Sequence, residues 1–345
     1  MTTTEFDGHK NNFNLLRFLA AIQVFISHYI WHFQVNFEGT NKILYTYFSN
    51  FSGVPIFFFI SGFLIYKSFQ KLKIKSYKKK LKIFFYNRYL RIYPGLIACF
   101  IFSFLILLIS GYLENKNVSP QNLVIWIISQ VTIFQFYNPF WLREYGIGVL
   151  NGSLWTIPVE MQFYFLIPFI YLFSKKRILF LIILTIFILL NFIFPTDRTT
   201  IVNKIYHITF LPHVYIFLLG CLLASTKNII KYILNLNLFL VIIIHLVFTQ
   251  FSTFSIINQI LLFIIVIKVG FMNYQNINKF FNKNDLSYGI YLYHMPIMNF
   301  ILYKNITTNF FIILIILLIT SFCSWNFVEK IFLRKKYIKN KKLFI

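Results

Sequence analysis

Few ionisable side chains interrupt the long apolar stretches of this chain, and those few are the first candidates for chemistry. An ionisable group inside an apolar helix is expensive to bury, so it commonly marks a functional site. Such a group can hold a charged ligand, move a proton or orient a neighbour. Six side chains meet this description: Arg17, His28, Arg88, Arg91, Glu160 and His294.

Arg17 and His28 belong to the same apolar stretch and are eleven residues apart. In an α-helix this spacing is three turns plus about 20°, so both side chains project from one face roughly 16 Å apart along the axis. His32 extends the same face. A histidine titrates near neutral pH, so His28 suits a general base or a transient nucleophile. The structural alternative is an arginine that reaches the membrane surface and a packed histidine.

Arg88 and Arg91 lie on adjacent turns ahead of Pro94. Guanidinium groups bind phosphate in a bidentate manner, which lysine does less well. The pair therefore indicates a site for a phosphorylated ligand. The alternative is a positively charged anchor at the cytoplasmic membrane surface.

Glu160 follows Trp155 in an apolar and aromatic stretch that continues to Tyr164. A carboxylate in such surroundings needs a partner or becomes protonated. A partner such as His28, or an arginine of another helix, would make Glu160 an orienting group. A purely structural hydrogen bond between helices is the alternative.

Ser287, Tyr291 and His294 follow one another at helical spacing, so they lie along one side of a helix. A hydroxyl, a phenol and an imidazole on one side indicate the wall of a polar site. Polar contacts that only hold helices together are the alternative.

The elements that position these side chains are predicted to be membrane helices. Of the 345 residues, 58% are hydrophobic and only 12% are charged, whereas about a quarter of a soluble domain is charged. A membrane helix takes roughly 20 apolar residues, so about ten or eleven helices use up the whole length. We predict one all-α integral membrane domain over 1–345. Its apolar segments are 13–33, 44–66, 84–110, 122–138, 151–173, 178–195, 206–224, 232–250, 255–272, 286–303 and 309–329.

Basic residues predict which segments cross the membrane, because loops rich in lysine and arginine stay in the cytoplasm. The loop 67–82 is strongly basic, so the N-terminal segment 1–12 is predicted to be cytoplasmic. If all eleven segments crossed, the basic cluster 175–177 and the basic tail 330–345 would lie outside. We therefore predict a bundle of about ten transmembrane helices with both termini cytoplasmic. The segment 122–138, which several polar side chains interrupt, is predicted to be interfacial or re-entrant.

The formal net charge of +24 would suggest nucleic-acid binding in a soluble protein. Here the lysines gather in short loops and in the tail, where they set topology and contact anionic lipid. No basic face is interleaved with exposed aromatic side chains, so nucleic acid is not an expected partner. The cysteines Cys99, Cys221 and Cys323 have no neighbouring Cys or His at metal-ligand spacing, and neither a metal site nor a disulfide is predicted.

Five motifs in this order resemble the membrane acyltransferase-3 family, which includes O-acetylases of bacterial O-antigens, capsules and related surface glycans. Each motif alone is weak, but together they extend over nearly the whole chain. Two features depart from the family: the extracytoplasmic esterase-like domain of some relatives is not expected here, and no proline follows Glu329-Lys330. The motifs are Arg17-x10-His28, the stretch 53–63, Arg88-x-x-Arg91 with Pro94, Ser153-Leu154-Trp155 through Glu160 to Tyr164, and Ser287 through His294.

The resemblance implies a multi-pass protein of the bacterial inner membrane that acts as an O-acyltransferase. Its co-substrate would be an acyl-CoA, with acetyl-CoA as the expected donor, and its acceptor a hydroxyl of a cell-surface polysaccharide or a lipid-linked precursor. His28 is the implied catalytic residue. Arg17 and Glu160 would serve the reaction beside it, Arg88 and Arg91 with Arg17 would bind the donor, and the acceptor side would be lined by Trp155, Tyr164, Ser287, Tyr291 and His294.

A transporter or flippase for a lipid-linked glycan is the alternative function, in which the same buried charges line a pathway. Against it, the sequence has neither an inverted repeat nor a pair of discontinuous helices. A non-enzymatic scaffold with a polar core does not explain why Arg17 and His28 share a face. The acyl group, the sugar position, the kind of glycan, a covalent acyl-enzyme and the oligomeric state stay open.

Overall fold

The protein is a bundle of helices in its computed structural model, which describes residues 11–335 apart from 115, 117, 194–202, 204, 205, 207, 208, 252–254, 273 and 274. Most of the predicted N-terminal segment 1–12 and of the tail 330–345 lies outside the described residues. Within them there is no β-strand, which confirms the predicted all-α class. The longer elements are α1 (Phe13–His32), α2 (Gly39–Asn50), α3 (Gly53–Lys71), α4 (Tyr77–Ile109), α5 (Pro120–Val131), α6 (Thr156–Phe173), α7 (Arg177–Ile193), α9 (Val214–Ser225), α10 (Lys227–Asn235), α11 (Leu238–Phe248), α12 (Ser255–Gly270), α13 (Gln275–Lys283), α14 (Ser287–Tyr303) and α15 (Phe310–Ser324).

Five helical stretches of the described chain are long and apolar enough to cross a membrane. α9 and α10 reach that length only together, with a bend of 97° between them, and would make a sixth. α7, α11 and α12 are apolar but have 17, 11 and 16 residues, fewer than the roughly 20 of a straight crossing. The described chain thus contains helices able to span a membrane, whereas the ten predicted crossings are not confirmed. The five stretches are Phe13–His32, Gly39–Lys71, Tyr77–Ile109, Gly152–Phe173 and Phe310–Lys335.

Two predicted segments are divided by polar or proline-containing breaks. The segment 44–66 is interrupted between α2 and α3, because Pro55 has no N–H to continue a helix but fits the first turn of a new one. The segment 232–250 is interrupted between α10 and α11. There the side chain of Asn237 accepts a hydrogen bond from the backbone N–H of Leu240 and caps the start of α11.

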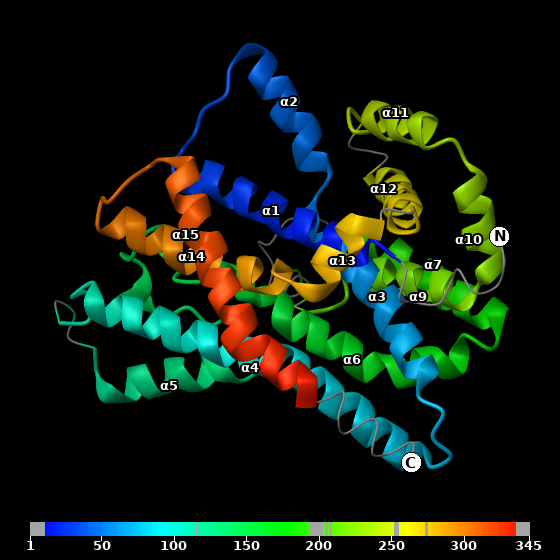
Figure 1. The fold of residues 1–345 in the computed structure, drawn as a ribbon, viewed down its shortest axis with the longest axis horizontal. Coiled ribbons are helices and arrows are strands. Elements are labelled where there is room, and N and C mark those ends of the chain that lie inside the picture. Colours follow the sequence, from blue (N-terminus) through cyan, green and yellow to red (C-terminus); the bar gives the residue numbers. More distant parts are fainter. Residues whose placement is uncertain are drawn as a thin grey trace.

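α5 occupies the first part of the segment that was predicted to be interfacial or re-entrant. It has 12 residues, a length of about 18 Å, whereas the hydrocarbon core of a bilayer is about 30 Å thick. The chain then runs through an irregular connection, with short 3-10 turns at Phe140–Leu142 and Gly152–Trp155, into α6. In Figure 1, α5 lies beside the later half of α4. This segment is too short to be a full crossing.

Three helices from distant parts of the chain, α1, α4 and α14, meet around the predicted site (Figure 1). α1 and α14 run in the same direction, because Arg17 contacts Asp285 near their beginnings and His28 contacts His294 nearer their ends. α4 joins them through Arg91, which contacts the same Asp285.

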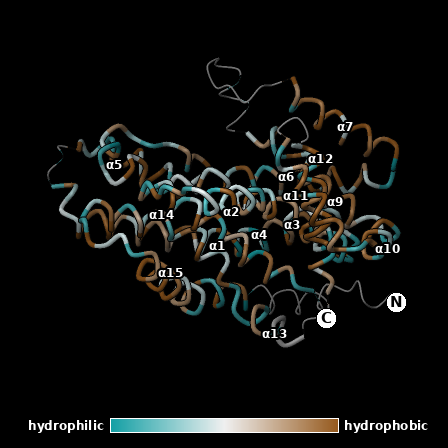
Figure 2. Tube along the Cα trace, turned by 90° about the horizontal axis from the view of Figure 1, so that it is seen from above, coloured by the Kyte–Doolittle hydropathy of each residue, from teal (hydrophilic) through white to brown (hydrophobic). Residues whose placement is uncertain are grey.

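The outer faces of the bundle are apolar. α7 and α15 are mostly brown in the hydropathy colouring of Figure 2. Large side chains on these helices are open to the surroundings, and Phe192, Ile193 and Phe311 are 67%, 67% and 70% exposed. Extended apolar surface of this kind is expected where a protein contacts lipid.

Candidate active site

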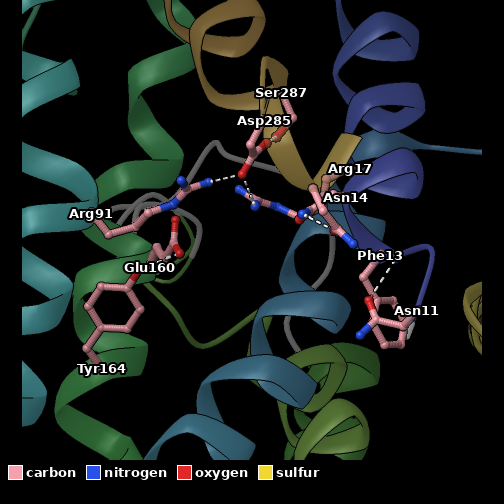
Figure 3. Close-up of polar contacts among 10 residues, drawn as sticks. Asn11, Phe13, Asn14, Arg17, Arg91, Glu160, Tyr164, Asp285 and Ser287 are labelled. Carbon is pink, nitrogen blue, oxygen red and sulfur yellow. Dashed lines mark hydrogen bonds and ion pairs between the residues drawn. The ribbon is translucent and has the colours of Figure 1, made fainter. Parts of the chain in front are cut away.

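One carboxylate, Asp285, binds two of the predicted arginines. Arg17 Nη1 lies 2.9 Å and Arg91 Nη2 lies 2.6 Å from the same oxygen, Oδ2. Ser287 Oγ donates to the other oxygen, Oδ1, at 2.5 Å. Figure 3 shows how α1, α4 and the start of α14 bring these side chains together. The buried side chain of Glu329 also interacts electrostatically with Arg91 and Asp285, so this largely buried cluster holds two guanidinium and two carboxyl groups.

The electrostatics of Asp285, which directly precedes α14, follow from these contacts. Burial alone would raise the pKa of Asp285, but Arg17 and Arg91 outweigh it and hold that pKa below its usual range. The carboxylate therefore stays ionised near neutral pH and fixes the direction of both guanidinium groups. Asp285 is missing from the predicted site residues. Asp285 could have been recognised from the sequence, because it is one of only nine acidic residues and lies two residues before Ser287.

Arg88 and Glu160 share a neighbour, Tyr164. The Tyr164 hydroxyl donates to Glu160 Oε1 at 2.5 Å, and the Arg88 guanidinium carbon lies 5.8 Å from the Tyr164 ring centroid. Arg88 comes from another helix and interacts electrostatically with Glu160, as one of the predicted alternatives proposed. The hydrogen bond of Glu160, however, stays within α6. Of the two alternative partners named for Glu160, His28 and an arginine of another helix, the contacts show the arginine, because His28 hydrogen bonds with α14 instead.

That partner is His294. Nδ1 of His28 and Nε2 of His294 are 2.7 Å apart, and the two rings are nearly parallel, with 7° between their planes. The second nitrogen of His294, Nδ1, lies 3.1 Å from the backbone oxygen of Ile290. A carbonyl oxygen only accepts, so in the neutral ring Nδ1 of His294 carries the proton and Nε2 is the acceptor. His28 must then donate from Nδ1, which leaves its lone pair on Nε2.

The two histidines differ in access. His294 is fully buried, whereas His28 is half-buried, and no described residue hydrogen bonds with Nε2 of His28. A buried residue that holds the tautomer of an accessible one is the arrangement that general base catalysis requires. His32, predicted to extend this face, is buried and its Nδ1 contacts the backbone oxygen of His28 at 2.7 Å.

A cavity of about 40 Å³ is lined by Arg17 of the arginine cluster, whereas neither His28 nor His294 is among the described residues that line it. Tyr291 connects the cavity with the histidine pair, since it lines the cavity and its ring centroid is 6.0 Å from that of His294. α1, α3, α6 and α14 all contribute to the wall. The lining side chains include Arg17, Ser61, Thr156, Glu160, Tyr288 and Tyr291.

Trp155 stands on the turn before α6 and lines a second, larger cavity. This turn is fastened to α14, because the Tyr291 hydroxyl donates to the backbone oxygen of Ser153 at 2.9 Å and Asn151 Nδ2 donates to that of Leu292 at 2.9 Å. Tyr291 of α14 thus contacts the turn that carries Trp155. Ser287 does not lie with them and instead binds Asp285.

The sequence matches the model of an acyltransferase domain over residues 10–328. The chain belongs to the acyltransferase-3 family. It is 30% identical over 318 residues to Nodulation protein 10 of Rhizobium leguminosarum bv. viciae, which covers 85% of this chain and 84% of the relative. It is 24% identical over 338 residues to an O-acetyl transferase of Shigella phage Sf6, with 95% and 97% covered.

A further relative is a peptidoglycan O-acetyltransferase of Listeria monocytogenes, 27% identical over 164 residues, which are 46% of this chain and 24% of the relative. No solved structure shows a significant match.

The family assignment confirms the resemblance that the five motifs indicated, and it identifies the chain as an acyltransferase. In this acyltransferase the motifs from α1, α3, α6 and α14 meet around one small cavity, and the α4 motif joins them through the contact of Arg91 with Asp285. Within the part of the chain that the structure describes, no group of His, Cys, Asp and Glu is placed to hold a metal ion.

Proposed function

We propose that this acyltransferase moves an acetyl group from acetyl-CoA to a hydroxyl of a cell-surface polysaccharide or its lipid-linked precursor. The observation that carries the proposal is the hydrogen bond between His28 and His294, which leaves a basic lone pair on Nε2 of His28. The choice of acetyl is supported by the phage and Listeria relatives, both named as O-acetyl transferases.

In the proposed reaction the acceptor hydroxyl gives its proton to Nε2 of His28 while its oxygen attacks the thioester carbonyl carbon. The carbon–sulfur bond then breaks, and the proton passes from His28 to the departing sulfur. The products are the ester and free coenzyme A. His294 accepts the hydrogen bond from Nδ1 of His28 and keeps the ring in the required tautomer. If His28 instead takes the acyl group itself, the same lone pair is the nucleophile and a covalent acyl-enzyme forms.

The arginines supply the proposed donor site. Arg17 and Arg91, which contact Asp285, and Arg88, which interacts with Glu160, are the guanidinium groups of this region. Guanidinium groups suit the phosphates of coenzyme A. Arg17 and His28 are roughly 16 Å apart along α1. A donor held at the arginines therefore needs an extended arm, such as pantetheine, to bring its thioester to His28.

We propose a location in the bacterial cytoplasmic membrane with both termini in the cytoplasm. The basic loop 67–82 supports this orientation. It puts the arginine cluster near the cytoplasm, where acyl-CoA is made, and directs the far ends of α1 and α14 outward.

Transfer of labelled acetyl from acetyl-CoA to the envelope glycan fraction tests the proposal, with purified wild-type protein and His28→Ala in the same lipid. We expect label with the wild type and with Gln121→Ala, an exposed position on α5, and none with His28→Ala. Equal label with His28→Ala would remove His28 from the chemistry. No label from any variant with several acyl-CoA donors would refute the proposed donor.

The same variants separate the enzyme from a glycan flippase. If His28→Ala abolishes acyl transfer while glycan export continues, His28 serves the transfer reaction. Loss of export together with unchanged acylation would favour the flippase.

A further inference from the structure

The larger cavity beside Trp155 has no part in the donor chemistry described so far. Its volume is about 220 Å³, whereas a single water needs only about 10–15 Å³, so it can hold an organic ligand. The connection between α5 and α6 builds most of its wall. The lining includes Trp126, Gln130, Gln135, Tyr137, Asn138 and Trp155, and no charged side chain is among the described residues that line it.

Three amide side chains of this wall use their N–H groups within the protein. Gln130 Nε2 donates to the backbone oxygen of Tyr137 at 3.2 Å, and Asn138 Nδ2 donates to that of Gly148 at 2.8 Å. Gln135 Nε2 donates to the backbone oxygen of Thr132. No described residue donates to the three side-chain oxygens, and that of Gln135 is buried. A buried hydrogen-bond acceptor without a donor is unfavourable. A ligand with many hydrogen-bond donors would therefore be the best match for this cavity.

Aromatic rings complete the chemistry of the wall. The indole of Trp155 is half-buried, and Trp126 and Tyr137 line the same space. Flat rings pack against the apolar C–H faces of a pyranose, while the amide oxygens accept from its hydroxyls. An anionic ligand would have no cationic partner among the described residues that line the cavity. An alkyl chain would leave the amide oxygens without hydrogen-bond donors. The chemistry fits a neutral, hydroxyl-rich ligand.

The position of the cavity relates it to the reaction centre. Trp126 packs on Phe100, beyond Arg91 along α4, with ring centroids 5.6 Å apart. Near the end of α14, Asn299 Nδ2 donates to the backbone oxygen of Val149 at 2.8 Å and so holds the wall on the side away from the arginines. Trp155 lines this cavity, and the next residue, Thr156, lines the smaller one. The two cavities are therefore neighbours at the turn before α6.

We infer that the cavity lined by Gln130, Gln135, Asn138 and Trp155 is a saccharide subsite, which holds a neutral sugar unit of the acceptor glycan. The inference rests on the proposed function, because it names the part of the acceptor that the enzyme recognises.

Tryptophan fluorescence of the purified protein in lipid reports binding directly, since two tryptophans line the cavity. The probes are neutral oligosaccharides released from the cell envelope of the source organism and, in a second arm, the anionic oligosaccharides of the same preparation. We expect a saturable change with the neutral fraction for the wild type and for Gln121→Leu. Gln130→Leu and Gln135→Leu should each weaken binding about tenfold, the size of one lost hydrogen bond.

Binding that is the same in Gln130→Leu, Gln135→Leu and the wild type, a preference for the anionic fraction, or no saturable change at all would overturn the inference.

Acetyl-transfer kinetics on the same samples distinguish failure of the saccharide subsite from failure of the proposed function. Saturable, glutamine-dependent binding without any acetyl transfer leaves the subsite in place and refutes the transferase proposal. Active Gln130→Leu enzyme should show an about tenfold higher KM for the acceptor with an unchanged KM for acetyl-CoA, which also shows that the variant is folded. An unchanged acceptor KM would contradict the subsite alone.

Discussion

At the residue scale, the protonation pattern of two imidazole rings follows from a single backbone carbonyl. The oxygen of Ile290 fixes the proton of His294 on Nδ1, so His294 offers a lone pair to His28. The proton of His28 is thereby drawn to Nδ1, and its Nε2 is left basic. In the reaction that we propose, an imidazole takes the orienting role that a carboxylate holds in the serine hydrolase triad.

His294→Ala is expected to lower kcat for acetyl transfer at least about a hundredfold, because the tautomer of His28 is no longer held. The KM for acetyl-CoA should change little. His294→Gln, whose side-chain oxygen can accept the same hydrogen bond, should recover part of the loss. If Ala and Gln variants were equally impaired in kcat, the hydrogen bond to His28 would not be the cause.

Asp285→Asn is expected to destabilise the protein, because it leaves two largely buried guanidinium groups without their counter-charge. Removing one partner of a buried ion pair costs about 3 kcal/mol or more. Thermal unfolding in detergent should show a lower Tm than for wild type, and Lys116→Ala, which breaks a loop ion pair with exposed Glu144, should have little effect. A Tm like that of the wild type would contradict the assigned role.

The pH dependence of the stability that Asp285 contributes follows from its lowered pKa. A carboxyl whose folded pKa lies below its unfolded value, about 3.9, contributes stability above that value and loses it as pH falls through the folded pKa. Asp285 should therefore stay ionised in the folded protein, and the wild type should keep a higher Tm than Asp285→Asn, from about pH 5.5 to 8. A difference that disappears within this range would show that Asp285 titrates there.

At the scale of the elements, α3 and α9 cross with almost no space between their backbones. A Cβ on Gly62 would meet the backbone oxygen of Phe217 at 2.1 Å, and one on Gly220 would meet that of Phe59 at 2.2 Å. Small residues allow this close approach between membrane helices. The crossing supports α3, whose Phe57 and Ser61 line the smaller cavity.

Gly62→Ala or Gly220→Ala is expected to push the two helices apart and to destabilise the protein by about 2 kcal/mol, as overpacking does. The measurement is Tm in detergent together with specific acetyl-transfer activity. Ile319→Ala on the exposed face of α15 serves as the control and should change neither. Unaltered Tm in both glycine variants would mean that the crossing is looser than described.

At the scale of the whole molecule, the direction of each segment decides which chemistry faces which side of the membrane. Helix length in the described residues accounts for five crossings, or six with the bent pair α9 and α10. The ten predicted crossings rest on the charge of the loops, and Lys175 in the loop between α6 and α7 distinguishes ten from eleven. It lies inside only if the α5 segment does not cross.

Single cysteines at Lys75, Lys175 and Lys304, in a background without Cys99, Cys221 and Cys323, test this topology. A membrane-impermeant maleimide should label Lys304→Cys in intact cells. Lys75→Cys and Lys175→Cys should react only after permeabilisation. Labelling of Lys175→Cys from outside would mean that the segment around α5 crosses the membrane, and would make the total eleven.

The sequence by itself determined the helical membrane class and the acyltransferase family. Apolar composition is a sum over neighbouring residues, and the motifs that mark the family are short and local. It also named most residues of the site, because a charge within an apolar helix is conspicuous wherever it occurs. Arg17, His28, Glu160 and His294 were found in this way, and Tyr291 was found by its helical spacing from Ser287 and His294.

Only the tertiary structure decided which side chains contact one another. Arg17 and Asp285 are 268 residues apart in the chain, and His28 and His294 are 266 apart, so no local pattern records either contact. For the same reason Asp285 was missed, and the partner of Glu160 stayed open between His28 and an arginine of another helix. The larger cavity was also beyond sequence reasoning, since the free acceptors of Gln130, Gln135 and Asn138 follow from where their N–H groups are used. Spacing along a helix fixes the face on which a side chain lies. The protonation state and the partner of that side chain depend on the helix that packs against this face.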